Sequence, residues 1–232
     1  ETEIHMLAYL DNSATTRQSE EVTRAMIDAV QDSFGNPSSL HRLGVDSEKL
    51  VKSSRKKLAA AAGAKDDEIY FTSGGSEADN QAIISAAKLG ALRNKKHIIS
   101  TKIEHHAVLH TLNKLEKEGF EITLLDVPEN GVVNVEDVEN AIREDTALVT
   151  IMFANNEIGT LQPIKEIGAV CKKHGVVFHT DAVQAAGHVK IDVNELNIDM
   201  LSISGHKFHG PKGVGVLFAR KTVPLTNVIE GG

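Results

Sequence analysis

Cysteine is almost absent from this sequence: its 232 residues include a single one, Cys171. One cysteine excludes an intrachain disulfide framework, and the simplest interpretation is a reducing, cytoplasmic compartment. No apolar run approaches the ~18 residues of a membrane-spanning helix, so we expect no membrane partner. Lysine and arginine form no long block and the formal net charge is -7, which argues against nucleic acid as the main partner.

The chain does have enough apolar material for one well-buried domain, since 41% of its residues are hydrophobic and 25% are charged. Apolar residues recur at helical spacing in several stretches, for example at Val22, Met26, Ala29 and Val30. Between such stretches, seven short runs predict strands: Ile69 to Phe71, His97 to Ser100, Glu121 to Asp126, Ala147 to Phe153, Val176 to Asp181, Met200 to Ser204 and Val214 to Ala219. This alternation predicts an α/β fold with a mostly parallel, seven-stranded sheet flanked by helices.

Three details refine this organisation. Residues 1–18 are expected to form an N-terminal segment, of which residues 1–5 precede Met6 and are interpreted as a remnant foreign to the natural chain. Residues 19–232 are expected to form one large domain, with two helices around the break at Gly35-Asn36-Pro37. The connection from His206 to Gly213 is short for a crossover helix, so one of the last two strands is expected to run antiparallel.

The first candidate binding element follows the first predicted strand, where Gly74, Gly75 and Ser76 precede a helical stretch. Glycines let the backbone approach an anion, and a helix N-terminus supplies N–H groups and a positive dipole end. The spacing is neither that of a P-loop nor that of a dinucleotide fingerprint. Taken alone, the segment is equally well interpreted as an ordinary helix N-cap after a strand.

Other polar residues follow the remaining strands. The pair His105-His106 lacks the ligand spacing of a metal site, and His105 can equally cap a helix, so we expect no metal. Asn155-Asn156 is typical of a structural turn. Asp181, at the end of a buried strand, requires either a positive partner or a capping role.

The segment from Ser204 to Gly213 is the most unusual part of the chain, because it places Ser204, His206 and Lys207 together between glycines. A lysine amine can form a Schiff base with an aldehyde cofactor. A buried acid can keep a pyridine nitrogen protonated, and a phosphate cradle can anchor the other end of the molecule. Together these elements predict a site for pyridoxal 5'-phosphate.

The same motifs carry a family resemblance along nearly the whole chain. They are Tyr9 to Thr16, Gly35 to Ser39, Phe71 to Glu77, Glu104-His105, Asn155 to Gly159, His179 to Gln184 and Ser202 to Gly213. In this order they resemble the cysteine desulfurases, the NifS/IscS-like members of the class V aminotransferase group. The resemblance implies the large domain of a fold-type-I pyridoxal-phosphate-dependent transferase.

The resemblance also implies roles for individual residues. Lys207 would attach the cofactor and move protons, and His105 would stack on the cofactor ring as a second catalytic residue. Asp181 would pair with the pyridine nitrogen and Gln184 with the phenolic oxygen. The remaining roles are to hold the phosphate, expected of Gly75, Ser76, Ser204 and His206, and to lie near the cofactor oxygen and the substrate carboxylate, expected of Asn155.

The implied reaction converts L-cysteine to L-alanine and an enzyme persulfide, whose sulfur passes to an acceptor or scaffold protein for iron–sulfur cluster assembly or thiolation. Family members are usually homodimers. Their nucleophilic cysteine and small C-terminal domain lie well beyond the lysine, so we expect both to be missing from a chain that stops at Gly232. Cys171 is no substitute, because it lies on an apolar helical stripe.

Two other hypotheses stay open. The chain is also compatible with a related class V enzyme, such as a selenocysteine lyase or an aminotransferase, since these share the lysine, the aspartate and the histidine. It is further compatible with a truncated scaffold that binds the cofactor without turnover. We therefore expect cofactor binding from this chain, and desulfurase activity when the missing half is supplied.

Overall fold

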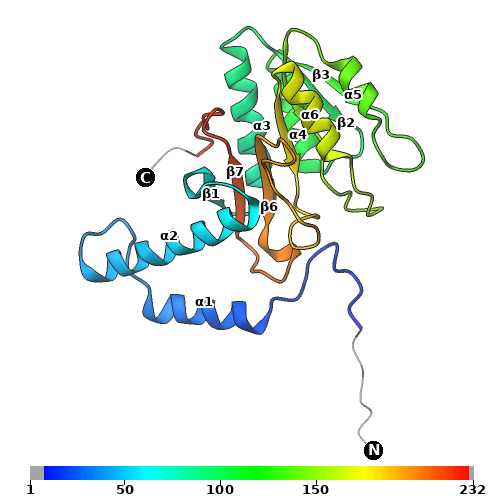
Figure 1. Ribbon diagram of the computed structural model, residues 1–232. Coiled ribbons are helices and arrows are strands. Elements are labelled where there is room, and N and C mark those ends of the chain that lie inside the picture. Colours follow the sequence, from blue (N-terminus) through cyan, green and yellow to red (C-terminus); the bar gives the residue numbers. More distant parts are fainter. Residues whose placement is uncertain (1–7, 230–232) are drawn as a thin grey trace, which may run out of the picture.

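A computed structural model describes residues 8–229, which form a seven-stranded sheet flanked by helices (Figure 1). The expected remnant at residues 1–5 lies outside the described residues. All seven predicted strands are present, with small shifts at their ends. Their bounds are β1 Ile69–Thr72, β2 His97–Thr101, β3 Glu121–Leu125, β4 Thr146–Thr150, β5 Val177–Asp181, β6 Met200–Ser204 and β7 Gly215–Ala219.

The direction of the strands decides where a ligand can bind. The spatial order is β1-β7-β6-β5-β4-β2-β3, and β7 pairs antiparallel with both of its neighbours. The other pairings are parallel, so the six strands other than β7 run in one direction. The predicted antiparallel strand is thereby confirmed. Six carboxyl ends meet at one edge of the sheet, the usual place for a ligand in an open α/β sheet.

The helices form in the connections between strands and in the N-terminal region. Their bounds are α1 Glu20–Asp32, α2 Arg42–Ala62, α3 Gly75–Ala91, α4 His106–Lys117, α5 Val135–Ala141 and α6 Ile164–His174, with 3₁₀ turns η1 Asp66–Glu68 and η2 Gly205–Lys207. The sequence pattern does not predict α5, because seven residues span less than two full turns. Its start is marked by the side chain of Asn134, which accepts a hydrogen bond from the Glu136 N–H at 3.1 Å.

Two hydrophobic cores cover the two faces of the sheet. Strand residues alternate between them: Ile98 and Leu217 belong to the core under α3 and α4, whereas Ile99 and Phe218 belong to the core under α5, α6 and the end of α2. Burial on both faces explains why the strands read as nearly continuous apolar runs.

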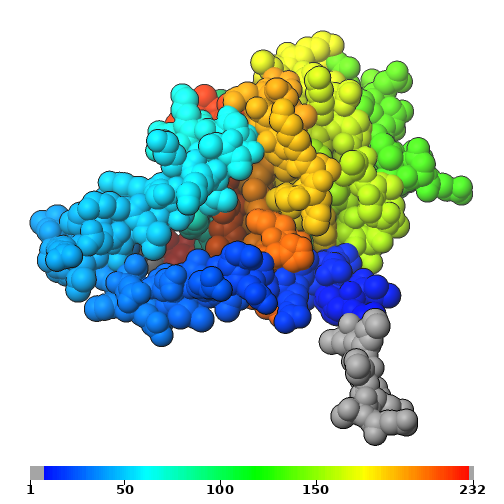
Figure 2. All heavy atoms as spheres, turned by 60° about the horizontal axis from the view of Figure 1, so that its bottom comes forward, coloured from blue at the N-terminus to red at the C-terminus, as the bar shows by residue number. Residues whose placement is uncertain are grey.

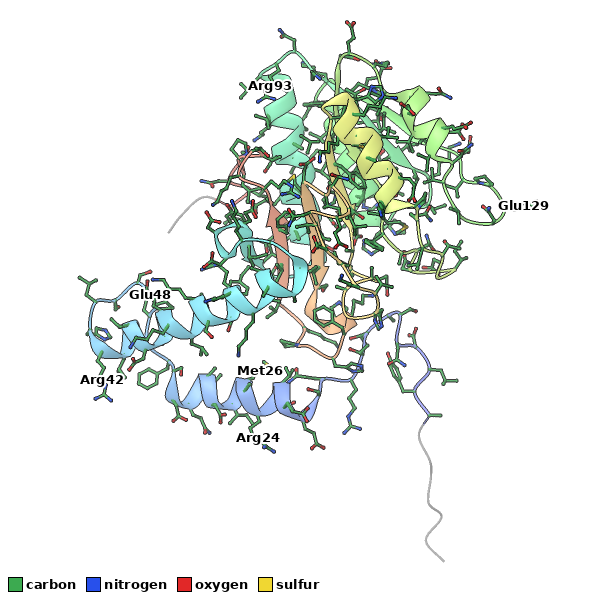
Figure 3. All side chains as sticks on the ribbon, in the orientation of Figure 1. Arg24, Met26, Arg42, Glu48, Arg93 and Glu129 are labelled. Carbon is green, nitrogen blue, oxygen red and sulfur yellow. The ribbon has the colours of Figure 1, made fainter. Side chains whose placement is uncertain are left out.

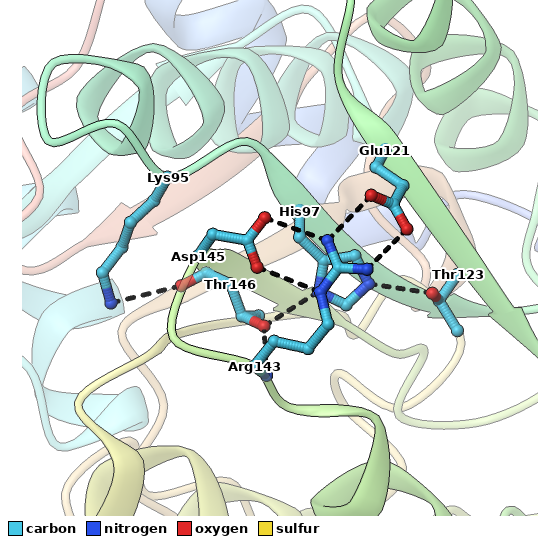
Figure 4. Close-up of polar contacts among 7 residues, drawn as sticks. All are labelled: Lys95, His97, Glu121, Thr123, Arg143, Asp145 and Thr146. Carbon is cyan, nitrogen blue, oxygen red and sulfur yellow. Dashed lines mark hydrogen bonds and ion pairs between the residues drawn. The ribbon is translucent and has the colours of Figure 1, made fainter.

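A ladder of polar contacts fixes the amino ends of β2, β3 and β4 (Figure 4). Arg143 donates to Glu121 and to Asp145 at 2.9 Å each, and the hydrogen bond from Arg143 lowers the pKa of Glu121. His97 contacts the Thr123 hydroxyl at 2.8 Å. These contacts lie at the edge opposite to the carboxyl ends of the strands, so their role is structural.

The helices α1 and α2 project away from the sheet, and the side chains of Arg24 on α1 and Arg42 on α2 point away from it (Figures 1 and 3). The predicted α1 helix is present, but none of its residues is buried. Phe34, just beyond it, is 69% exposed. The apolar stripe of α1 therefore contributes to neither core. Within residues 8–229, no helix is both long enough and apolar enough to cross a membrane.

Packing of α6 predicts a large effect of a small substitution. A Cβ atom added at Gly168 would lie 2.0 Å from the backbone oxygen of Leu196. We expect Gly168→Ala to lower the free energy of unfolding by about 1–3 kcal/mol, as overpacking does, when measured by urea denaturation. The adjacent exposed Ala169, changed to serine, is the control and should stay within about 0.5 kcal/mol. Equal stabilities of the two variants would contradict this description of the contact.

Candidate active site

A cavity of about 410 Å³ opens at the carboxyl ends of the strands. It brings together residues that are as far apart in sequence as Asp11 and Lys207. Eight of the nine predicted site residues line it: Gly75, Ser76, His105, Asp181, Gln184, Ser204, His206 and Lys207.

One end of the cavity is formed by the N-terminus of α3, a helix of 17 residues. A Cβ atom at Gly75 would lie only 2.6 Å from Val183 Cγ2, so glycine keeps this wall open. Ser204, at the end of β6, is 4% exposed, and its Cβ lies 3.5 Å from the position that a Cβ atom on residue 75 would take. Backbone N–H groups, the dipole of a long helix and hydroxyl groups make this end suitable for an anion such as phosphate.

Lys207 lies in η2, directly after β6, and its side chain is held by the N-terminal segment. Its Nζ donates to the carbonyl oxygens of Ser13 and Ala14, at 2.5 and 3.0 Å. Burial lowers the pKa of Lys207, and the nearby carboxylate of Asp181 opposes that shift. A lysine whose ammonium form is destabilised is more easily converted to the neutral, nucleophilic amine.

The segment from Asp11 to Ser19, which we call the N-terminal strap, lies across the loop that carries Lys207. Figure 2 shows its blue atoms against the orange atoms of that loop. The Thr16 N–H and hydroxyl both donate to the His206 carbonyl at 2.8 Å, and the Ser19 N–H donates to the His209 carbonyl at 3.1 Å. The strap thus fixes one wall of the cavity and the backbone of the lysine loop.

Asp181 ends β5 and is 6% exposed. Its Oδ1 accepts the Val183 N–H at 2.9 Å, which fixes the carboxyl group. Burial raises the pKa of Asp181, while the Val183 hydrogen bond and the positive charges of His105 and Lys207 lower it. His105 also caps α4, since its Nδ1 accepts the Ala107 N–H at 3.1 Å.

Asn155 stands apart from the other eight predicted residues. It does not line this cavity but a neighbouring groove, which shares Asn156, Glu157 and Gln184 with it. Its amide donates to the Ile103 carbonyl at 3.0 Å, and its Oδ1 accepts the Glu157 N–H at 2.9 Å. The turn role considered for the Asn pair is therefore present, and a role of Asn155 toward a cofactor or a substrate stays a prediction.

Several residues of this region are not among the site residues predicted from the sequence. Asp79 lines the cavity, and Glu104 lies buried beside it, 5% exposed. A signal for Asp79 was present, because it follows Gly75 by four residues and so lies on the same helix face. No comparable signal identifies the strap carbonyls of Ser13 and Ala14, since backbone groups leave no trace in residue type.

Asp79, His105 and Asp181 also place one potential metal ligand each within 4.8 Å of one another. All three residues belong to the cavity already described. The expectation that the protein binds no metal therefore stays a prediction.

Cys171 lies far from this chemistry, on α6 and 1% exposed. Burial raises the pKa of its thiol, so the reactive thiolate is disfavoured. We expect iodoacetamide to modify Cys171 in the folded protein at least ~10-fold more slowly than in urea, as followed by mass spectrometry. Labelling at the same rate in both states would show that the thiol is accessible.

The fold and the cavity define a member of the fold-type-I transferases. The model of the aminotransferase class-V family matches residues 8–232, and the chain belongs to this family. Among curated relatives, the chain is 56% identical over 225 residues to "Cysteine desulfurase IscS" of Methanosarcina thermophila, covering 97% of this chain and 55% of the relative. It is 54% identical to "Putative cysteine desulfurase IscS 1" of Bacillus subtilis (strain 168), covering 97% and 59%.

Solved structures agree with this assignment. The chain superimposes on a "NIFS-LIKE PROTEIN" with a TM-score of 0.94 at 41% identity, covering 98% of this chain and 62% of that one. It superimposes on "SspA in complex with cysteine" with a TM-score of 0.93 at 42% identity, covering 97% and 65%. The chain thus spans little more than half the length of the curated relatives, and somewhat more of the solved chains.

Proposed function

We infer that this chain is the cofactor-binding part of a cysteine desulfurase and holds pyridoxal 5'-phosphate on Lys207. The observation that carries this proposal is the meeting of three groups in one cavity. These are a half-buried lysine, a buried aspartate and a glycine-lined helix N-terminus. Each group has an ordinary structural explanation when taken alone, and pyridoxal phosphate requires all three at once.

The donor set fits the cofactor at both of its ends. Gly75, Ser76, Ser204 and His206 would hold the phosphate at the N-terminus of α3, where a side chain at position 75 would close the wall. The Asp181 carboxylate would keep a proton on the ring nitrogen, Gln184 would donate to the phenolic oxygen, and His105 would stack on the ring. When bound, the cofactor withdraws electrons from the substrate and stabilises negative charge at its α carbon.

The remaining chemistry falls to the side chains around it. Lys207 Nζ would take the proton from the substrate α carbon and return one to the product, a role that suits a lysine of lowered pKa. The thiolate of the nucleophilic cysteine, which is expected to be missing from this chain, would then attack the substrate sulfur. The carbon–sulfur bond breaks, the carbon gains a proton, and the products are L-alanine and a persulfide. Asn155 is proposed to lie near the substrate carboxylate.

L-cysteine is the proposed substrate because the relatives are named cysteine desulfurases and one structural neighbour was solved in complex with cysteine. A selenocysteine lyase or another class V aminotransferase remains the alternative within the same family. An acceptor or scaffold protein for sulfur, and iron–sulfur cluster assembly or thiolation as its use, are part of this proposal. A reducing, cytoplasmic location is likewise proposed.

A homodimer is proposed from the apolar surface of α1 and α2. Met26, Ile27, Leu43 and Leu50 are each exposed by 43% or more, and Val30 by 75%. Scattered apolar residues are ordinary on a surface, but a stripe along two projecting helices is typical of a surface that a second chain covers.

The test is product analysis with L-cysteine. We expect the cofactor-loaded protein, in a chain extended to the full length of its relatives and with dithiothreitol present to reduce the persulfide, to form L-alanine and sulfide in equal amounts. Pyruvate or a keto acid as the main product would instead indicate an elimination or a transamination. L-Serine, which lacks the sulfur, is the matched control substrate and should yield no alanine.

A further inference from the structure

The side chain of Asp79 is buried in the cavity wall without a counter-charge of its own. It lies on α3, one turn after Gly75, and is 1% exposed. Its Oδ1 has no hydrogen-bond partner among the described residues, and burial together with the charge of Asp181 raises the pKa of Asp79 against the opposing effect of the Ser202 hydroxyl. A buried carboxylate left in this condition is costly, whereas a buried neutral carboxylic acid is far less so.

Two further buried acids surround Asp79. Carboxylate oxygens of Asp79 and Asp181 lie within 4.8 Å of one another. Glu104 accepts the Thr101 hydroxyl at 2.6 Å and the Met152 N–H at 3.1 Å, and burial raises its pKa to about 8. Like charges at such distances cannot all be ionised in a low dielectric.

Positive charge acts unequally on these acids, although a ring nitrogen of His105 lies within 4.8 Å of carboxylate oxygens of both Asp79 and Asp181. Lys207 and His105 act on Asp181 and lower its pKa. Asp79 has His179 at 3.7 Å instead, and burial lowers the pKa of that imidazole to about 3. His179 is therefore neutral, and its two ring nitrogens contact the hydroxyls of Thr150 and Ser202 at 2.8 and 3.0 Å.

We propose that Asp79 is a positioning residue that stays an uncharged carboxylic acid, so that Asp181 is the carboxylate that faces the cofactor's ring nitrogen. The neutral acid fills the space behind Asp181 without competing for the proton on that nitrogen. The protonation of Asp79 is a property of this chain alone. The consequence of that protonation for the cofactor rests on the proposed function.

The first test uses the protein without cofactor. A proton that the folded state binds more tightly than the unfolded state stabilises the fold at low pH, and the benefit is lost as pH rises toward the raised native pKa. Asp79→Asn mimics the neutral acid at every pH. The quantity to follow is the urea midpoint of the wild type minus that of Asp79→Asn. We expect this difference to begin to fall near the pKa of an aspartate in an unfolded chain, ~3.9, and to keep falling from about pH 4.5 to 7.5.

The difference between the two proteins cancels the titration of the other groups that face Asp79 for as long as Asp79 itself is uncharged; these groups are Asp181, Glu104, His179, His105 and Lys207. Glu129→Gln, at an exposed loop position (Figure 3), is the control and should give a flat difference. A flat difference for Asp79→Asn as well would overturn the proposal. If Asp79→Asn does not fold, the carboxyl carbon resonance of Asp79 in labelled wild type decides instead, and an ionised Asp79 at pH 7 would overturn the proposal.

The second test uses the cofactor-loaded protein and follows the visible absorbance of bound pyridoxal phosphate against pH. We expect wild type and Asp79→Asn to share one midpoint and one cofactor dissociation constant, with Asp79→Ala binding more weakly. Were Asp79 charged, its replacement would remove a negative charge from the cavity wall and move the midpoint to lower pH. Failure of the wild type to bind the cofactor would refute the proposed function and leave the unfolding result to stand by itself.

Discussion

Replacing Lys207 by alanine is expected to abolish the covalent attachment of pyridoxal phosphate and to reduce alanine formation by at least ~10²- to 10⁴-fold, the range of one general acid–base group. The reason is that the Lys207 side chain is expected both to attach the cofactor and to move the substrate proton. Of the lysine side chains in the described residues, it is the one that lines the cavity. The measurement is alanine release by the chain extended to the full length of its relatives, together with intact mass after borohydride reduction.

The neighbouring lysine supplies the control for this substitution. Lys212 lies five residues further along the same loop and is exposed. Lys212→Ala should keep the adduct and most of the activity. An adduct that persists in Lys207→Ala, or one that disappears in Lys212→Ala, would show that the attachment site has been assigned to the wrong residue.

Asp181→Asn is expected to separate cofactor attachment from catalysis. The amide can still pack at the end of β5, but it carries no charge to keep a proton on the ring nitrogen. We expect the adduct on Lys207 to form and alanine formation to fall by about 10²- to 10³-fold, as when one preorganised electrostatic group is removed.

The prediction for Asp181 also fixes how the activity should change with pH. Burial raises the pKa of Asp181, so the wild type should lose activity as the pH falls and the carboxylate takes up a proton. In Asp181→Asn the residual activity should lack this acidic limb. Asp199→Asn is the control, because Asp199 is a partly buried acid just before β6, at the opposite edge of the sheet, where it accepts the Phe178 N–H at 2.9 Å. An unchanged acidic limb in Asp181→Asn would assign it to another group.

Much of the fold could be predicted because burial on both faces imposes a simple pattern. Strands such as Gly215–Ala219 are nearly continuous apolar runs, and the predicted bounds of the strand Met200–Ser204 are confirmed. The predicted end of the fourth strand at Phe153 is too late by three residues, since β4 ends at Thr150. Residues 151–153 remain buried, and the N–H groups of Ile151 and Phe153 still donate to carbonyl oxygens of β5, so hydrophobicity alone does not mark the end of the strand.

The site was predictable where function requires a particular side chain at the end of a strand or at the start of a helix. Lys207, Asp181 and Gly75 satisfy that condition, and the cavity brings them together. Asp79 was not predicted although it follows Gly75 by one helical turn, because an acid inside an amphipathic helix resembles a solvent-facing residue until the packing is known. The apolar stripe of α1 shows the reverse, since a pattern typical of a buried face remains exposed in this chain.

The most direct test of the central claim is an intact mass spectrum of the purified wild-type protein after incubation with pyridoxal phosphate and borohydride reduction, followed by peptide mapping. We predict one reduced cofactor per chain, attached to the peptide that contains Lys207. A folded chain without any adduct, or with an adduct on other lysines alone, would contradict the assignment of this cavity as a pyridoxal phosphate site.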